Sequence, residues 1–208
     1  NYIGVDMKIT RARSWVVKQP ARKSDNELKL KDRGYVFIQV DTDEGITGWG
    51  EITTYPGPVA NRAISAYVNQ IGSWLIGENP EDTERIWNKI FRGMTYVGTR
   101  GATSAAISGI DIALWDIKGK MLNQPVYKLL GGAVRDKIAL YTHPPEPEGP
   151  EHITKHAKDI VNAGYKAFKM DPMMHNLHVG NSTFLDGEIS AEAEEKAIEM
   201  VAAAREAV

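Results

Sequence analysis

Lys169 and Asp171 stand two positions apart at the end of a short apolar and aromatic segment, residues 165–170, which is bounded by Gly164 and Pro172. This pattern predicts a buried β-strand, on which residues i and i+2 point to the same side. A cation and a carboxylate that face one space can bind an anionic substrate and move a proton. A plain salt bridge at a strand end explains the same pair, so the pattern alone leaves both interpretations open.

Five histidines are the other side chains with chemistry to offer. His152 and His156 are four positions apart on a predicted helix, a spacing compatible with a metal ion, but on such a helix we expect a solvated face. The remaining three lie close in sequence to the ends of two predicted strands, and they are His143, His175 and His178.

Composition excludes several classes of protein. The 208 residues are 42% hydrophobic and 25% charged with a formal net charge of −2, which is ordinary for a globular protein and gives no signal for nucleic acid. There are no cysteines, so disulfides and thiolate metal sites are excluded. No apolar run is long enough to span a bilayer and no signal peptide is visible, so we expect a cytoplasmic protein without a membrane partner.

The first part of the chain, residues 7–54, reads as strands. Alternating residues predict strands at 7–17 and 35–40, and a turn at Gly45 leads into a third, so that a small antiparallel sheet is expected. The polar connection 18–34 has no apolar periodicity and is either a substrate lid or a solvated loop.

Three helices are expected next, at 58–75, 80–91 and 102–121. The second would begin with Pro80 at its first helical position. The third is apolar on nearly all sides and must be largely buried. Asp111 and Asp116 on that helix are expected to be structural, hydrogen-bonded or paired with a nearby lysine.

The second part of the chain alternates strand and helix. Strands are predicted at 137–142 and 165–170, and helices at 150–163 and from Ser190 onward. This alternation is typical of βα units and a parallel sheet. Because two strands cannot form a stable parallel sheet, and because the last helical run continues to Val208 without a cap, we expect a fragment of a longer protein.

Four separated motifs then occur in a familiar order. They are 43–51 (DEGITGWGE), 108–120 (SGIDIALWDIKGK), 125–132 (PVYKLLGG) and the segment around Lys169. Together they resemble the mandelate racemase and muconate lactonizing enzyme branch of the enolase superfamily. The resemblance implies an α+β capping domain, antiparallel sheet plus helices, at residues 1–135. It implies that residues 136–208 are the first two βα units of an incomplete α/β TIM-type (β/α)7β barrel.

The resemblance also implies a reaction, abstraction of the proton α to a carboxylate. In the family the second strand ends in Lys-x-Lys, and here Lys169 matches the first lysine while Asp171 replaces the second. A Lys-x-Asp-Pro motif resembles acid-sugar dehydratases of the gluconate and galactonate type. Lys169 would neutralise the substrate carboxylate or the enediolate, and Asp171 would orient the substrate, bind a hydroxyl or, if buried, act as acid or base.

The expected partner is a small-molecule sugar acid, from which water is eliminated to give a 2-keto-3-deoxy product. His143 would lie on the catalytic face of the barrel and bind substrate. His175 and His178 would bind the polyol end or be exposed loop residues. The alternatives are racemisation or epimerisation of a 2-hydroxy acid or dipeptide, and a non-catalytic truncated module in which Lys169 and Asp171 merely pair.

The family's metal ion is usually Mg²⁺, held by three carboxylates on later barrel strands. Those ligands are expected beyond Val208, so no metal ligand is assigned within this segment. The segment alone is therefore expected to be inactive, and the complete polypeptide is expected to be a hydro-lyase and a homo-oligomer.

Overall fold

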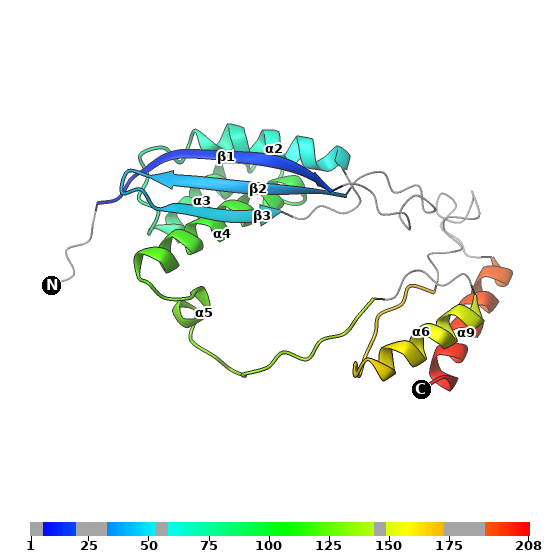
Figure 1. Ribbon diagram of the computed structural model, residues 1–208. Helices are drawn as coiled ribbons and strands as arrows, with labels where there is room; N and C mark the ends of the chain where they lie inside the picture. The colour runs from blue at the N-terminus through cyan, green and yellow to red at the C-terminus, as the bar shows by residue number, and fades with distance from the viewer. Residues whose placement is uncertain (1–5, 20–32, 53–57, 144–148, 173–189) are drawn as a thin grey trace. The chain divides into compact units, whose positions relative to one another are not determined.

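The chain divides into two compact units, residues 1–134 and 135–208, in the computed structural model (Figure 1). Each unit is described by itself. The structure describes residues 6–19, 33–52, 58–143, 149–172 and 190–208. The connection 20–32, most of the predicted lid or loop, lies outside these residues.

The first unit contains the predicted antiparallel sheet. Its strands are β1 (Ile9–Gln19), β2 (Arg33–Thr42) and β3 (Thr47–Ile52), in the order β1-β2-β3. The turn between β2 and β3 places Gly45 at φ +74°, a conformation that glycine adopts without strain. Alternate residues of β2 are fully buried, and they are Val36, Ile38 and Val40. The sequence alternation therefore does place one face of the sheet in the core.

Helices cover that buried face. Figure 1 shows α2 (Pro58–Gly72), α3 (Thr83–Gly93) and α4 (Ala102–Met121) on one side of the sheet, followed by the short α5 (Val126–Leu129). Nine residues of α4 are buried, which confirms that this helix is largely enclosed. The α+β capping architecture predicted for this part of the chain is confirmed.

Glycines set the close approach of α4 to β3. A methyl group added at Gly48 would overlap the carbonyl oxygen of Ala113, and one added at Gly50 would overlap that of Gly109. A methyl group at Gly109 would in turn meet the side chains of Ile38 and Ile52. The motifs 43–51 and 108–120 are therefore the two sides of one helix–sheet contact, which needs glycine for lack of space.

Helix α3 begins later than predicted. The structure starts it at Thr83 with Asp82 as the N-cap, so Pro80 precedes the helix. The reason is local, because the side chain of Asn79 accepts a hydrogen bond from the Glu81 amide at 3.0 Å and the Asn79 carbonyl accepts from the Asp82 amide at 3.1 Å. These bonds hold the chain in a turn until Asp82.

The second unit contains two helices, α6 (Pro150–Asn162) and α9 (Ala191–Glu206), which lie side by side in Figure 1. Their buried residues are Ile153, Ala157, Ala193, Ala197, Met200 and Ala204. Helix α9 begins at the predicted Ser190, whose hydroxyl accepts a hydrogen bond from the Ala193 amide at 3.2 Å.

The predicted strands 137–142 and 165–170 are wrong for the described residues of this unit. They form a single parallel bridge, between Thr142 and Phe168, and no strand. Parallel strands are stable when both faces are covered, whereas here Ile138 is 76% exposed and Leu140 is 68% exposed. The described residues thus contain the two helices of the expected βα units without formed barrel strands.

No helix within the described ranges is both long enough and apolar enough to cross a membrane.

Candidate functional site

The parallel bridge joins the two segments that carry the predicted site residues. The Thr142 amide donates to the Ala167 carbonyl at 3.4 Å, and the Lys169 amide donates to the Thr142 carbonyl at 2.9 Å. Because the segments run in the same direction, the residues that follow the bridge emerge at the same end. His143 and Lys169 are therefore neighbours although 26 positions separate them in sequence.

Three side chains meet at this end, and we call them the His143 cluster: His143, Lys169 and Asp171. The Oδ2 atom of Asp171 lies 3.4 Å from Nε2 of His143 and 3.7 Å from Nζ of Lys169. The side chains are 44%, 53% and 38% exposed in that order, so a small molecule can reach all three.

An open ion pair with an adjacent imidazole has limited but definite chemistry. It offers a cation for an anionic group, a carboxylate that accepts hydrogen bonds, and a ring whose nitrogens donate or accept hydrogen bonds. The geometry agrees with both interpretations of Lys169 and Asp171, the salt bridge and the catalytic pair. Their catalytic assignment therefore stays a prediction, as does substrate binding by His143.

The other two candidate histidines, His175 and His178, lie outside the described residues. Their roles in substrate binding stay predictions as well.

The part of the chain that the structure describes contains no candidate site for a divalent metal ion. No group of three or more histidine, aspartate or glutamate side chains there is arranged to hold one. The described residues therefore do not fit Mg²⁺.

Asp116 in α4 is structural, as predicted. Its Oδ2 atom accepts from the Trp49 amide at 2.8 Å and from Lys120 Nζ at 2.6 Å, and Lys120 Nζ also donates to the Thr47 carbonyl at 2.7 Å. These bonds tie α4 to β3 beside the glycine contact. The carboxylate is occupied in holding the fold.

Asp111, one turn earlier in α4, is perturbed by burial. Desolvation raises the pKa of this carboxyl, the negative charge of Glu84 raises it further, and a hydrogen bond with Trp115 opposes the change. These contacts lie inside the first unit, away from any residue of the His143 cluster in sequence. We assign Asp111 no part in the candidate site.

Helix α6 holds two features that the sequence did not reveal. The rings of His152 and His156 stack with centroids 6.4 Å apart, and Nδ1 of His156 is buried without a hydrogen-bond partner in the described structure. His152 is exposed, as expected of a solvated face, whereas His156 is half-buried because one side of its ring is covered. The spacing of two histidines along a helix does not show how deeply either ring is buried.

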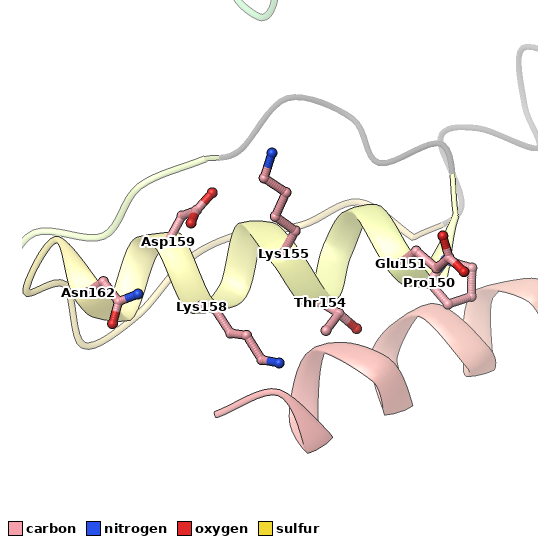
Figure 2. Close-up of a pocket in the computed structure, with 7 residues that line it drawn as sticks. All are labelled: Pro150, Glu151, Thr154, Lys155, Lys158, Asp159 and Asn162. Atoms are coloured by element: carbon pink, nitrogen blue, oxygen red, sulfur yellow. The ribbon is translucent and has the colours of Figure 1, made fainter.

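Residues along α6 also line a shallow hollow of about 570 Å³ (Figure 2). Six of its seven lining residues are of polar or charged types, and Lys155 and Lys158 point to different sides of the helix. None of the residues of the His143 cluster lines it. This hollow is thus lined by other residues than those of the candidate site.

Known sequences share the pattern of the first unit. A family profile described as the N-terminal domain of mandelate racemase / muconate lactonizing enzyme matches residues 8–131. Two curated relatives are named D-galactonate dehydratase. The protein from Pectobacterium atrosepticum is 38% identical over 163 residues, which is 77% of this chain and 41% of the relative. The protein from Cronobacter sakazakii is 40% identical over 140 residues, 66% of this chain and 35% of the relative.

Solved structures extend the likeness over both units. A protein of Zymomonas mobilis ZM4, provisionally named a dehydratase, has a TM-score of 0.81 and 32% identity over 97% of this chain. A member of the enolase superfamily from Salmonella Typhimurium has a TM-score of 0.79 and 32% identity over 97% of this chain. This chain covers 52% of each of them, so it spans about half the length of the proteins that it matches.

Proposed function

Because the chain belongs to the mandelate racemase/muconate lactonizing enzyme family, whose N-terminal domain profile covers residues 8–131, we propose that the complete protein dehydrates a sugar acid. The reaction removes the proton α to the carboxylate and eliminates water from the neighbouring carbon. The product is a 2-keto-3-deoxy acid.

The choice of dehydration is supported by two kinds of observation. The curated relatives from Pectobacterium atrosepticum and Cronobacter sakazakii are named for the dehydration of D-galactonate. In this chain Asp171 stands where the resemblance would place a second lysine. Racemisation requires proton transfer on both faces of the substrate, and the lost lysine removes one such group.

The observation that carries the proposal is the meeting of Lys169, Asp171 and His143 after the parallel bridge. A lysine ammonium in that position can pair with the substrate carboxylate. This ion pair strengthens as negative charge builds on the carboxylate during loss of the α-proton. An interaction that is stronger in the transition state than in the bound substrate lowers the activation barrier of that step. The carboxylate of Asp171 contacts both the imidazole of His143 and the ammonium of Lys169.

A divalent ion, Mg²⁺ by resemblance, would add further charge stabilisation in the complete protein. The described residues of this chain offer no ligand group for it. We therefore propose that its ligands come from other parts of the complete protein, and we assign no step of the reaction to it here.

The test is turnover of a panel of aldonic and aldaric acids, D-galactonate among them, by the complete polypeptide with Mg²⁺. Semicarbazide absorbance detects the 2-keto-3-deoxy product. We expect at least one substrate to react and the activity to disappear with EDTA. The 208-residue chain, assayed in parallel, is expected to be inactive.

Two outcomes would redirect the proposal. Exchange of the α-proton with solvent deuterium and inversion of a 2-hydroxy acid, without keto product, would favour racemisation or epimerisation. A complete polypeptide that binds neither metal nor any acid of the panel would favour a non-catalytic module with Lys169 paired to Asp171.

A further inference from the structure

We propose that the face of the β1-β2-β3 sheet opposite the helices is an interface between two copies of this chain, related by a two-fold axis that runs along β2. The proposal concerns the first unit and does not depend on the proposed function. It starts from a group of apolar and aromatic side chains on that face, which we call the outer sheet face: Trp15, Val17, Tyr35, Phe37 and Trp49.

The register of the sheet brings these side chains together. Because residues 36, 38 and 40 of β2 are buried, its odd-numbered residues point to the other face of the sheet. Trp15 of β1 is paired with Phe37 of β2, and Trp49 of β3 is paired with Gln39 of β2. The two tryptophans therefore lie on opposite sides of β2, at neighbouring levels along it.

The outer sheet face is more apolar than a sheet surface that faces water. An antiparallel sheet with one solvated face usually carries polar residues there. Here Trp15 is 45% exposed, Val17 is 47% exposed and Trp49 is 46% exposed, while Figure 1 shows the helices of this unit on the opposite side. Contiguous exposed aromatic residues are typical of protein–protein contact surfaces. The composition of this face therefore indicates an interface.

Several of these side chains are already held in place. The guanidinium of Arg13 lies 4.5 Å from the centre of the Trp15 ring and donates to Oε1 of Gln39 at 3.2 Å and 3.0 Å. The rings of Tyr35 and Phe37 have their centroids 6.4 Å apart. Side chains that are ordered before association lose less conformational entropy when a partner binds.

The charges on this side of the sheet favour a second copy over a charged partner. Two arginines and two carboxylates have the same orientation as the outer sheet face, and they are Arg11, Arg13, Asp41 and Glu51. A nucleic acid or an anionic membrane surface requires a predominantly basic face. A face whose charges balance is complementary to itself, and two-fold symmetric dimers are the commonest soluble oligomers.

A two-fold axis along β2 makes the contacts self-complementary. It places β1 of one copy over β3 of the other, with the two sheets about 10 Å apart. Because Trp15 and Trp49 lie at neighbouring levels, the two rings can interleave across the interface. Arg13 lies at the level of Trp49, since both residues flank Gln39, so its guanidinium can also contact the Trp49 ring of the second copy.

The first test measures self-association of the 208-residue chain by sedimentation over a range of concentrations. We expect a dimer, and we expect Trp49→Lys to raise its dissociation constant by at least about 10-fold, because the new ammonium would lie against Arg13 of the other copy. The matched control is Ile112→Lys on α4, where the side chain is 49% exposed, and it should associate like the unaltered chain. Circular dichroism checks that both variants are folded.

The second test uses the absence of native cysteines. Residue 39 is on β2 and therefore close to the proposed axis, so two Gln39→Cys chains should be joined by a short bismaleimide into a covalent dimer. We expect this product with the 208-residue chain and with the complete polypeptide. Ser108→Cys, an exposed position on α4 on the other side of the sheet, is the control and should stay unlinked.

Three results would overturn the proposal. They are a monomeric chain at every concentration, unchanged association of Trp49→Lys, and Gln39→Cys chains that react with the reagent without forming a dimer. Linkage in the 208-residue chain but not in the complete polypeptide would also overturn it, because the rest of the polypeptide would then cover this face. Dehydratase activity is measured separately by turnover, so the two proposals can fail independently.

Discussion

Asp171 and Glu78 are both paired with basic side chains, but the two carboxylates differ in their exposure to solvent. Asp171 is 38% exposed and shares one oxygen between an imidazole and an ammonium, which leaves the group accessible to a ligand. Glu78 in the first unit is 14% exposed and is enclosed by Lys89 and Arg85 of α3. Its own backbone carbonyl accepts the Ile9 amide at 2.9 Å, so Glu78 links α3 to β1.

Replacing Glu78 by glutamine is expected to destabilise the first unit at neutral pH. The hydrogen bond from Lys89 lowers the pKa of Glu78 from its ordinary value of 4.5, burial opposes this, and Arg85 lowers it further. A carboxyl with a depressed pKa stabilises the fold above its unfolded-state pKa, and this contribution is lost as pH falls through the folded-state value. We expect a loss of about 1 kcal/mol at pH 7 for Glu78→Gln.

Urea unfolding of Glu78→Gln and the unaltered chain, from about pH 7 down to about pH 2, measures this dependence. The two stability curves should converge below about pH 4. Glu44→Gln, in the exposed turn after β2, is the control and should follow the unaltered chain. A constant difference between Glu78→Gln and the unaltered chain at all pH values would contradict the role of charge.

The sequence predicts part of the candidate site and misses the rest. The spacing of Lys169 and Asp171 in the primary structure is enough to suggest that they face one space. The contact of Asp171 with His143 is not visible in the same way, because it depends on a parallel bridge between segments 26 residues apart. No local pattern reports which residues such a bridge will align.

At the scale of elements, the most informative feature is the contact between β3 and α4. Gly48 and Gly50 face the backbone of α4, where Ala113 and Gly109 leave no room for a side chain. Asp116 closes the same contact through the Trp49 amide. The hairpin motif and the helix motif that suggested the family are thus the two sides of one packing arrangement.

Replacing Gly50 by alanine is therefore expected to destabilise the first unit by about 1–3 kcal/mol or more. The added methyl group would overlap the Gly109 carbonyl oxygen, which belongs to a helix and cannot move aside without shifting α4. Gly149→Ala is the matched control, because that glycine has φ 174° and open space around its Cα.

Thermal unfolding followed by circular dichroism distinguishes the two substitutions. We expect a clearly lower Tm of the first unit for Gly50→Ala and a change close to zero for Gly149→Ala. A Gly50→Ala chain as stable as the original would show that α4 does not need this close approach.

The elements that the sequence predicts best are those whose signal is local. Helix α4 has the predicted bounds, 102–121, because its apolar residues are continuous through five turns. Helix α3 begins three residues late because a single asparagine side chain holds a turn. The strands expected at 137–142 and 165–170 depend on neighbours across a parallel sheet, and the described residues supply one bridge between them.

At the scale of the whole molecule, the two units differ in how complete they are. The first has a continuous core, from Met7 through Ile117, that involves every one of its sheet strands and its helices α2, α3 and α4. The second buries one small face between α6 and α9 and leaves Ile138, Leu140 and Tyr141 largely exposed. Because the chain spans about half the length of its relatives, the proposed activity belongs to the complete polypeptide.

Turnover of D-galactonate and the related acids by the complete polypeptide, compared between Lys169→Ala and Lys166→Ala, tests the central claim most directly. Both substitutions remove one lysine from the segment after α6, but only Lys169 belongs to the His143 cluster. The proposal predicts that Lys166→Ala keeps the activity and that Lys169→Ala lowers kcat/KM by at least about 10²-fold, since charge stabilisation at the substrate is lost. Equal activity of the two variants would contradict the assignment of the site.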